Sequence, residues 1–178
     1  MLGTSKDIKY PGLNVLPPGV ERHVVNGGGL TGFQVFPDDE IEIINNEGNQ
    51  ICEIICFNKN GKSELGILNL KDNSKKNYIK NILLGKDESI LATKYQLKKR
   101  NLNISDSHAA IIFDPDTNAG EVIKLKSKDK CYAIFASPGD DMDVTNQNPP
   151  SELTIFIKRS KITNDKELNV IPDPVYEP

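Results

Sequence analysis

The chain has 178 residues, a hydrophobic share of 37% and a formal net charge of -3. This length suits one well-filled domain, and the charge provides no basic field, so we expect no nucleic-acid partner. The first ten residues lack a basic segment followed by an apolar one, and no run of about 18 apolar residues occurs. We therefore expect no signal peptide and no membrane contact, and a cytoplasmic location. The three cysteines have no CxxC spacing, which favours free thiols in a core.

Residues 1–31 are rich in residues that interrupt regular structure. Pro11, Pro17 and Pro18 precede the run Gly27-Gly28-Gly29, so we expect this segment to be extended or looping, with the first regular strand near Gly32. The glycine run fits neither GxGxxG nor a GK[ST] motif, which favours a flexible turn over a phosphate-binding loop.

The segment 33–58 predicts two strands around a turn, Ile41 to Ile44 and Gln50 to Phe57. Both faces of the second strand are apolar, and Glu53 stands alone among aliphatic residues. A buried carboxylate is costly unless it is paired, hydrogen-bonded or metal-bound. Glu53 is therefore either a satisfied structural charge, which we favour, or part of a functional site. One face carries Cys52, Ile54 and Cys56, and the other Ile51, Glu53, Ile55 and Phe57.

A helical insertion is predicted at about residues 74–100. Its first helix covers Ser74 to Leu84, and its second begins after Asp87, with apolar residues at three- and four-residue spacing. Lys98, Lys99 and Arg100 suit the negative end of this second helix, so we favour a structural role for them over phosphate binding. Before the insertion, Leu65 to Leu70 is expected to form a short strand or extended edge.

Strands resume after the insertion, and the whole pattern predicts a mainly β (α+β) fold. We expect a distorted β-barrel or sandwich with a two-helix insertion, comprising residues 32–160, followed by a proline-rich arm or linker at 161–178. The first two of the later strands are expected to form a hairpin-like unit. The predicted strands are Ala109 to Phe113, Glu121 to Leu125, Tyr132 to Ala136 and Leu153 to Lys158.

Several residues could hold a divalent metal. Asp140, Asp141 and Asp143 lie close together in a long loop, but they do not match an EF-hand, and a solvated acidic turn is favoured. His108 is a titratable candidate for a ligand or metal site without a visible partner. Around a pocket, the candidate metal ligands would be Glu53, His108, Cys131, Asp140, Asp141 and Asp143.

The run EGNQICEIICFN, from Glu47 to Asn58, resembles the EGGQVAD…FN segment of urea carboxylase-associated proteins, a family largely of unknown function. That family usually has aspartate where this chain has Glu53. From about Gly32 to Arg159, the order of segments is similar to the amino-terminal region of long bacterial proteins that continue into a glycine cleavage T-protein-like aminomethyltransferase domain. The similar segments are the RN at Arg100, the strand at Ala110 to Phe113, Ala136-Ser137-Pro138-Gly139, and Pro149-Pro150 followed by Leu153 to Arg159.

This resemblance implies a β-barrel-like module used beside one-carbon or methylated-amine metabolism. It implies that an aminomethyltransferase-like domain or subunit is the partner, and that tetrahydrofolate acts only through that partner. Gln50, Glu53 and Asn58 are the motif positions that the resemblance makes candidates for ligand binding. The alternative is a small metal-dependent enzyme or small-molecule-binding protein of the urea carboxylase-associated type.

Overall fold

The computed structural model describes residues 16–139 and 149–161. These residues form eight strands in two antiparallel four-stranded sheets, which confirms the mainly β fold and selects a sandwich over a closed barrel. The first sheet has the order β1 (Val20–Val25), β8 (Leu153–Lys158), β3 (Glu40–Asn45), β6 (Glu121–Lys126). The second sheet has the order β2 (Leu30–Val35), β7 (Cys131–Ala136), β4 (Cys52–Asn58), β5 (Ala109–Ile112).

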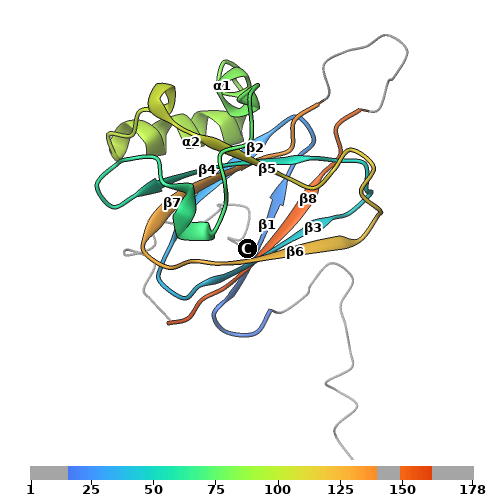
Figure 1. The fold of residues 1–178 in the computed structure, drawn as a ribbon, viewed down its shortest axis with the longest axis horizontal. Helices are drawn as coiled ribbons and strands as arrows, with labels where there is room; N and C mark the ends of the chain where they lie inside the picture. Colours follow the sequence, from blue (N-terminus) through green and yellow to red (C-terminus); the bar gives the residue numbers. More distant parts are fainter. Residues whose placement is uncertain (1–15, 140–148, 162–178) are drawn as a thin grey trace, which may run out of the picture.

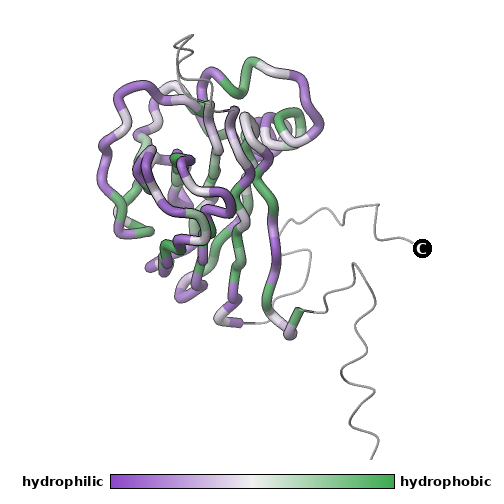
Figure 2. The backbone as a smooth tube through the Cα atoms, turned by 90° about the vertical axis from the view of Figure 1, so that its right-hand side faces the viewer, coloured by the Kyte–Doolittle hydropathy of each residue, from purple (hydrophilic) through white to green (hydrophobic). Residues whose placement is uncertain are grey.

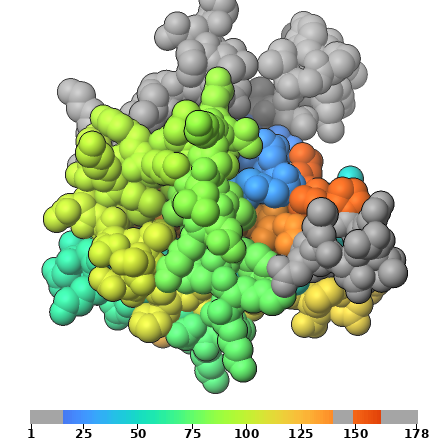
Figure 3. Space-filling view, turned by 90° about the horizontal axis from the view of Figure 1, so that it is seen from above, coloured from blue at the N-terminus to red at the C-terminus, as the bar shows by residue number. Residues whose placement is uncertain are grey.

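Two helices, α1 (Tyr78–Ile82) and α2 (Glu88–Lys99), form a third layer on the outer face of the second sheet (Figure 1). The same segment covers this side of the molecule when it is seen from above (Figure 3). Among the described residues, neither helix has the length and apolar character required to span a membrane. The helical insertion covers the outer face of the second sheet, because its buried residues pack against those of β2, β4 and β7.

The second sheet is buried on both faces, which explains the continuous apolar run of β4. Cys52, Ile54 and Cys56 belong to the core between the sheets, and Ile55 and Phe57 belong to the core beneath the helices. All five are at most 1% exposed. Hydrophobic stretches accordingly follow the strands, whereas many connecting loops are hydrophilic (Figure 2). Strands covered on two sides lose the alternating pattern of half-exposed strands.

Strand β1 lies inside the segment 1–31, where we expected extended or looping chain, and Leu30 already belongs to β2. The sequence VERHVV does not alternate clearly, and proline and glycine flank it. Its pairing partner is β8, with Val20 opposite Lys158 and Val25 opposite Leu153. This strand depends on a partner from the other end of the described chain, which local pattern does not reveal.

The strand or extended edge expected at Leu65 to Leu70 is wrong. The chain forms a 3₁₀ turn, η2 (Leu65–Leu68), and Asn69 ends it in the left-handed conformation with φ 58°. Leu65 and Leu68 are both buried, and their three-residue spacing matches the period of a 3₁₀ helix. The first helix is also shorter than predicted, because it begins at Tyr78 and not near Ser74.

The hairpin-like unit expected after the insertion is also wrong. Strand β5 pairs with β4 in the second sheet, whereas β6 pairs with β3 in the first. The β3–β4 and β5–β6 connections therefore both cross between sheets, and they contact each other. Asn49 N–H donates to Thr117 O at 2.7 Å, and Gly120 N–H donates to Asn45 O at 2.7 Å.

We expect Gly32→Ala to destabilise the fold by about 1–3 kcal/mol, the range typical of overpacked cores. A Cβ at Gly32 would lie 2.4 Å from Tyr132 Oη, so the buried ring would have to move. Urea denaturation measures the loss. Gly66→Ala is the matched control, because a Cβ there meets no atom within 4 Å. Equal stabilities for the two variants would contradict the prediction.

Candidate functional site

The carboxylate of Glu53 is fully buried and accepts hydrogen bonds from the helical layer. Its Oε2 accepts from Ser74 Oγ at 2.6 Å and from Tyr78 N–H at 2.9 Å, and its Oε1 accepts from Ile79 N–H at 2.8 Å. Asn77 precedes α1 but makes no side-chain capping bond. Glu53 therefore caps α1 from the sheet, since free N–H groups at a helix start favour a carboxylate. This geometry favours the structural interpretation of Glu53.

Gln50 holds the two ends of a long connection together. Its Nε2 donates to Pro138 O at 2.7 Å and to Ile51 O at 2.9 Å, and its Oε1 accepts from Ser151 N–H at 2.9 Å. The residues between these ends include Asp140, Asp141 and Asp143, which lie outside the described residues. Gln50 thus fixes the base of the connection that carries those three aspartates.

Asn58 and Cys131 lie opposite each other where β4 pairs with β7. The Asn58 Oδ1 accepts from the N–H groups of Asn60 and Lys62, which shapes the turn after β4. Burial and a hydrogen bond between the Cys56 and Cys131 thiols raise the pKa of Cys56, with the hydrogen bond the larger cause. A thiol held neutral is a poor metal ligand, so Cys56 is unsuited to join Cys131 in a metal site.

His108 lies apart from these residues, at the start of β5. Its Nδ1 is 2.9 Å from Asp72 Oδ2, and both side chains are more than half exposed. Within the described ranges, no group of three or more His, Cys, Asp and Glu residues could hold a metal ion. The structure therefore does not bring His108, Glu53 and Cys131 into one site.

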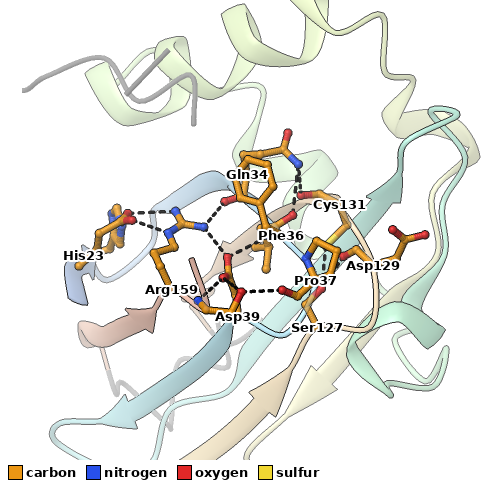
Figure 4. Close-up of polar contacts among 12 residues, drawn as sticks. His23, Gln34, Phe36, Pro37, Asp39, Ser127, Asp129, Cys131 and Arg159 are labelled. Carbon is orange, nitrogen blue, oxygen red and sulfur yellow. Dashed lines mark hydrogen bonds and ion pairs between the residues drawn. The ribbon is translucent and has the colours of Figure 1, made fainter. Parts of the chain in front are cut away.

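A buried polar cluster centres on Arg159, just beyond β8. Its side chain is 3% exposed, and its Nη1 donates to Asp39 Oδ2 at 2.8 Å and to Gln34 O at 2.8 Å. Its Nε and Nη2 donate to Glu21, which also contacts His23 at 3.1 Å. Figure 4 shows Arg159 between His23 on one side and Asp39 on the other. The cluster joins β1, the end of β2 and β8, and its charges satisfy one another.

A second arginine, Arg100, borders a hollow of about 370 Å³ at the end of the helical layer. Its Nη1 donates to Gln34 Oε1 at 2.5 Å, and its guanidinium carbon lies 4.6 Å from the centre of the Tyr132 ring. Burial lowers the pKa of Arg100. Burial also raises the pKa of Tyr132 to about 12, with the charge of Arg100 acting in the opposite direction. Tyr132 is therefore neutral at physiological pH.

The hollow includes two of the residues singled out from the sequence, Asn58 and Cys131. The described residues lining it are Gln34, Asn58, Lys59, Asn60, Gly61, Arg100, Asn101, Leu102, Lys130, Cys131 and Tyr132. From the sequence we expected Arg100 only at a helix end, and neither Gln34 nor Tyr132 was predicted as a site residue. These three residues come from three elements that only the tertiary fold brings together. The one signal in the sequence was Gln34, a polar residue between the apolar Phe33 and Val35 of a predicted strand.

A comparison with family models finds no match to this chain, so the resemblance to urea carboxylase-associated proteins gains no support there. Among curated proteins, the trimethylamine-oxide aldolase of Ruegeria pomeroyi is 32% identical to this chain over 171 residues. The match covers 96% of this chain and 22% of the relative. The chain therefore spans about a fifth of the length of that enzyme.

We expect Glu53→Gln to lower the free energy of unfolding by about 2–3 kcal/mol, because it removes a buried charge acceptor and leaves donors unsatisfied. Chemical denaturation measures the loss. Glu42→Gln is the matched control: Glu42 is 44% exposed and lies 3.5 Å from Lys124, so we expect a change below about 0.5 kcal/mol. A stable Glu53→Gln protein that had lost only ligand or metal binding would instead indicate a functional carboxylate.

The Arg159 cluster predicts an acid-sensitive contribution to stability. Burial alone would raise the pKa of Glu21, but its contacts with His23 and Arg159 together outweigh burial and lower the pKa from 4.5 to about 2. Because the folded-state pKa lies below the unfolded one, the contribution of Glu21 is complete above about pH 4.5 and is lost towards pH 2.

We therefore expect the stability difference between the wild type and Glu21→Gln to be largest near neutral pH and to shrink steadily from pH 5 to pH 2. Denaturation of both proteins across this range measures the difference. A gap that stayed constant over the whole range would contradict the role given to Glu21.

Proposed function

We propose that this chain is an accessory, non-catalytic module in methylated-amine metabolism, acting beside a folate-dependent aminomethyltransferase-like partner. The observation that carries the proposal is the 32% identity along 96% of the chain to a trimethylamine-oxide aldolase, of which the match covers 22%. This similarity supports methylated-amine metabolism in general. The accessory role and the folate-dependent partner are the finer steps of the proposal.

The described residues support a module without its own chemistry. The family resemblance pointed to Glu53 and Gln50. The polar side-chain atoms of both residues make hydrogen bonds within the protein. Asn58 likewise shapes a turn. In the proposed arrangement, the partner binds tetrahydrofolate, which would accept a one-carbon unit there. The module contributes a rigid surface.

The helical layer offers an apolar surface for that partner. Leu91 and Tyr95 are 50% and 56% exposed, and their four-residue spacing places them on one face of α2. Leu84, which precedes α2, is 79% exposed. Exposed apolar residues gathered on one element are typical of protein contacts. We propose that the aminomethyltransferase-like partner covers this face.

The second candidate function is a small-molecule-binding protein, as in the alternative drawn from the sequence. The observation that favours it is the hollow of about 370 Å³ beside Arg100, a volume within the usual range of ligand sites. The two functions are compatible, because the hollow and the exposed face of α2 involve different residues.

We expect the purified chain alone to release no formaldehyde from trimethylamine oxide. Formaldehyde is the readout because it and dimethylamine together contain all the atoms of trimethylamine oxide. Native mass spectrometry of the protein isolated gently from its own cells should show a complex with a heavier aminomethyltransferase-like chain. Formaldehyde production by the chain alone would contradict a non-catalytic role.

The contact surface has its own test in the same complex. Leu91→Glu combined with Tyr95→Glu should weaken association at least about tenfold, because charges would replace buried apolar groups at the contact. Val122→Glu is the matched control, since Val122 is 44% exposed but lies on β6 in the other sheet. Equal association of both variants would exclude the α2 face as the contact.

A further inference from the structure

We infer that the hollow bordered by Arg100, Tyr132 and Lys130 is a binding site for a small organic carboxylate, with Arg100 as its main ligand-binding residue. This inference is independent of the proposed partner. Three observations carry it: how the guanidinium is held, the charge of the lining residues, and which N–H groups are already hydrogen-bonded within the protein.

The guanidinium of Arg100 is held in one orientation by its neighbours. Gln34 is 4% exposed, and its Nε2 donates to Cys131 O at 2.7 Å and to Val35 O at 3.3 Å. These two carbonyls fix the amide of Gln34, so its Oε1 faces Arg100 Nη1 at 2.5 Å. The ring of Tyr132 lies against the guanidinium at 4.6 Å. A preorganised guanidinium loses less conformational entropy on binding a ligand.

Within the described residues, the contacts of Arg100 leave its charge without a counter-ion. Its side-chain hydrogen bonds go to two neutral amides, Gln34 and Gln96. Tyr132 stays protonated, because its pKa is raised to about 12. Three cations and no carboxylate occur among the described residues that line the hollow, the cations being Lys59, Arg100 and Lys130. Asp129 lies just outside, 3.9 Å from Lys59. The hollow therefore favours an anion.

The available donors suit a carboxylate better than a phosphate. Phosphate sites usually use backbone N–H groups at loops and helix N-termini. Here the N–H groups of Asn60, Gly61 and Lys130 donate to Asn58 or Asp129. The helix end at the hollow is the C-terminus of α2, which presents carbonyl groups and offers a phosphate no free N–H groups. The remaining guanidinium N–H groups match the two oxygens of a carboxylate.

The walls indicate the size and character of the ligand. Among the lining residues, Leu102 and Tyr132 are largely apolar, whereas Asn60 and Asn101 are polar. A cationic group on the ligand would be repelled by Lys59 and Lys130. We therefore expect a compact carboxylate without a positive charge, of the size of a five-carbon dicarboxylate.

The test uses glutarate as the probe, with its uncharged diamide, glutaramide, and inorganic phosphate for comparison. Calorimetric titration of the full chain at low salt should give the tightest binding for glutarate, weaker binding for phosphate and none for glutaramide. Arg100→Gln should weaken glutarate binding at least about tenfold, and Arg100→Lys should also weaken it because the forked geometry is lost. Phosphate binding that is tighter than glutarate binding, or equal binding of glutarate and glutaramide, would overturn the assignment.

Lys99→Gln is the matched control, because it removes one positive charge from the neighbouring exposed position at the same helix end. Its affinity for glutarate should stay within about twofold of the wild type, since an exposed charge outside the hollow contributes little. If both variants lost glutarate affinity equally, the loss would reflect only the removal of one positive charge. That result would overturn the site. Backbone amide shifts of the wild type give a readout without any variant: glutarate must perturb Asn101, Leu102 and Tyr132.

Discussion

The fold depends on the second sheet, which is buried on both faces, and on the buried carboxylate of Glu53 within it. Strand β4 packs against the first sheet on one side and against the helical layer on the other. Glu53 points toward the helices, where its carboxylate accepts three hydrogen bonds from Ser74, Tyr78 and Ile79. A buried carboxylate is tolerated only with such partners. The short helix α1 in turn obtains from Glu53 the cap that Asn77 does not provide.

The sequence predicted the layers of this fold better than their connections. The apolar run from Cys52 to Phe57 correctly indicated a strand covered on two sides, and the periodicity after Asp87 correctly indicated α2. The local pattern could not show that β3 and β4 lie in different sheets, because a polar turn looks the same in a hairpin and in a crossover. Strand β1 was missed for a related reason: its pairing with β8 spans more than a hundred residues.

The candidate site residues divide in the same way, into those that a local pattern reveals and those that only the tertiary fold brings together. A lone charge in an apolar strand identified Glu53 as buried, because composition and alternation carry that information. The hollow at Arg100 needed the tertiary fold, since Gln34 on β2, Tyr132 on β7 and Arg100 after α2 are far apart in sequence. Nothing local to Arg100 separates it from the neighbouring lysines of the basic triplet.

Gln34 joins two arginines whose surroundings differ in the respect that matters for binding. Its backbone oxygen accepts from Arg159, and its side-chain oxygen accepts from Arg100. Burial alone would lower the pKa of Arg159, but hydrogen bonds and charges from Glu21 and Asp39 raise it above its usual range, whereas burial lowers the pKa of Arg100. A guanidinium with two carboxylates has little to gain from a further anion. One that is desolvated beside neutral amides gains a counter-ion when a carboxylate binds, so the capacity for a ligand lies with Arg100.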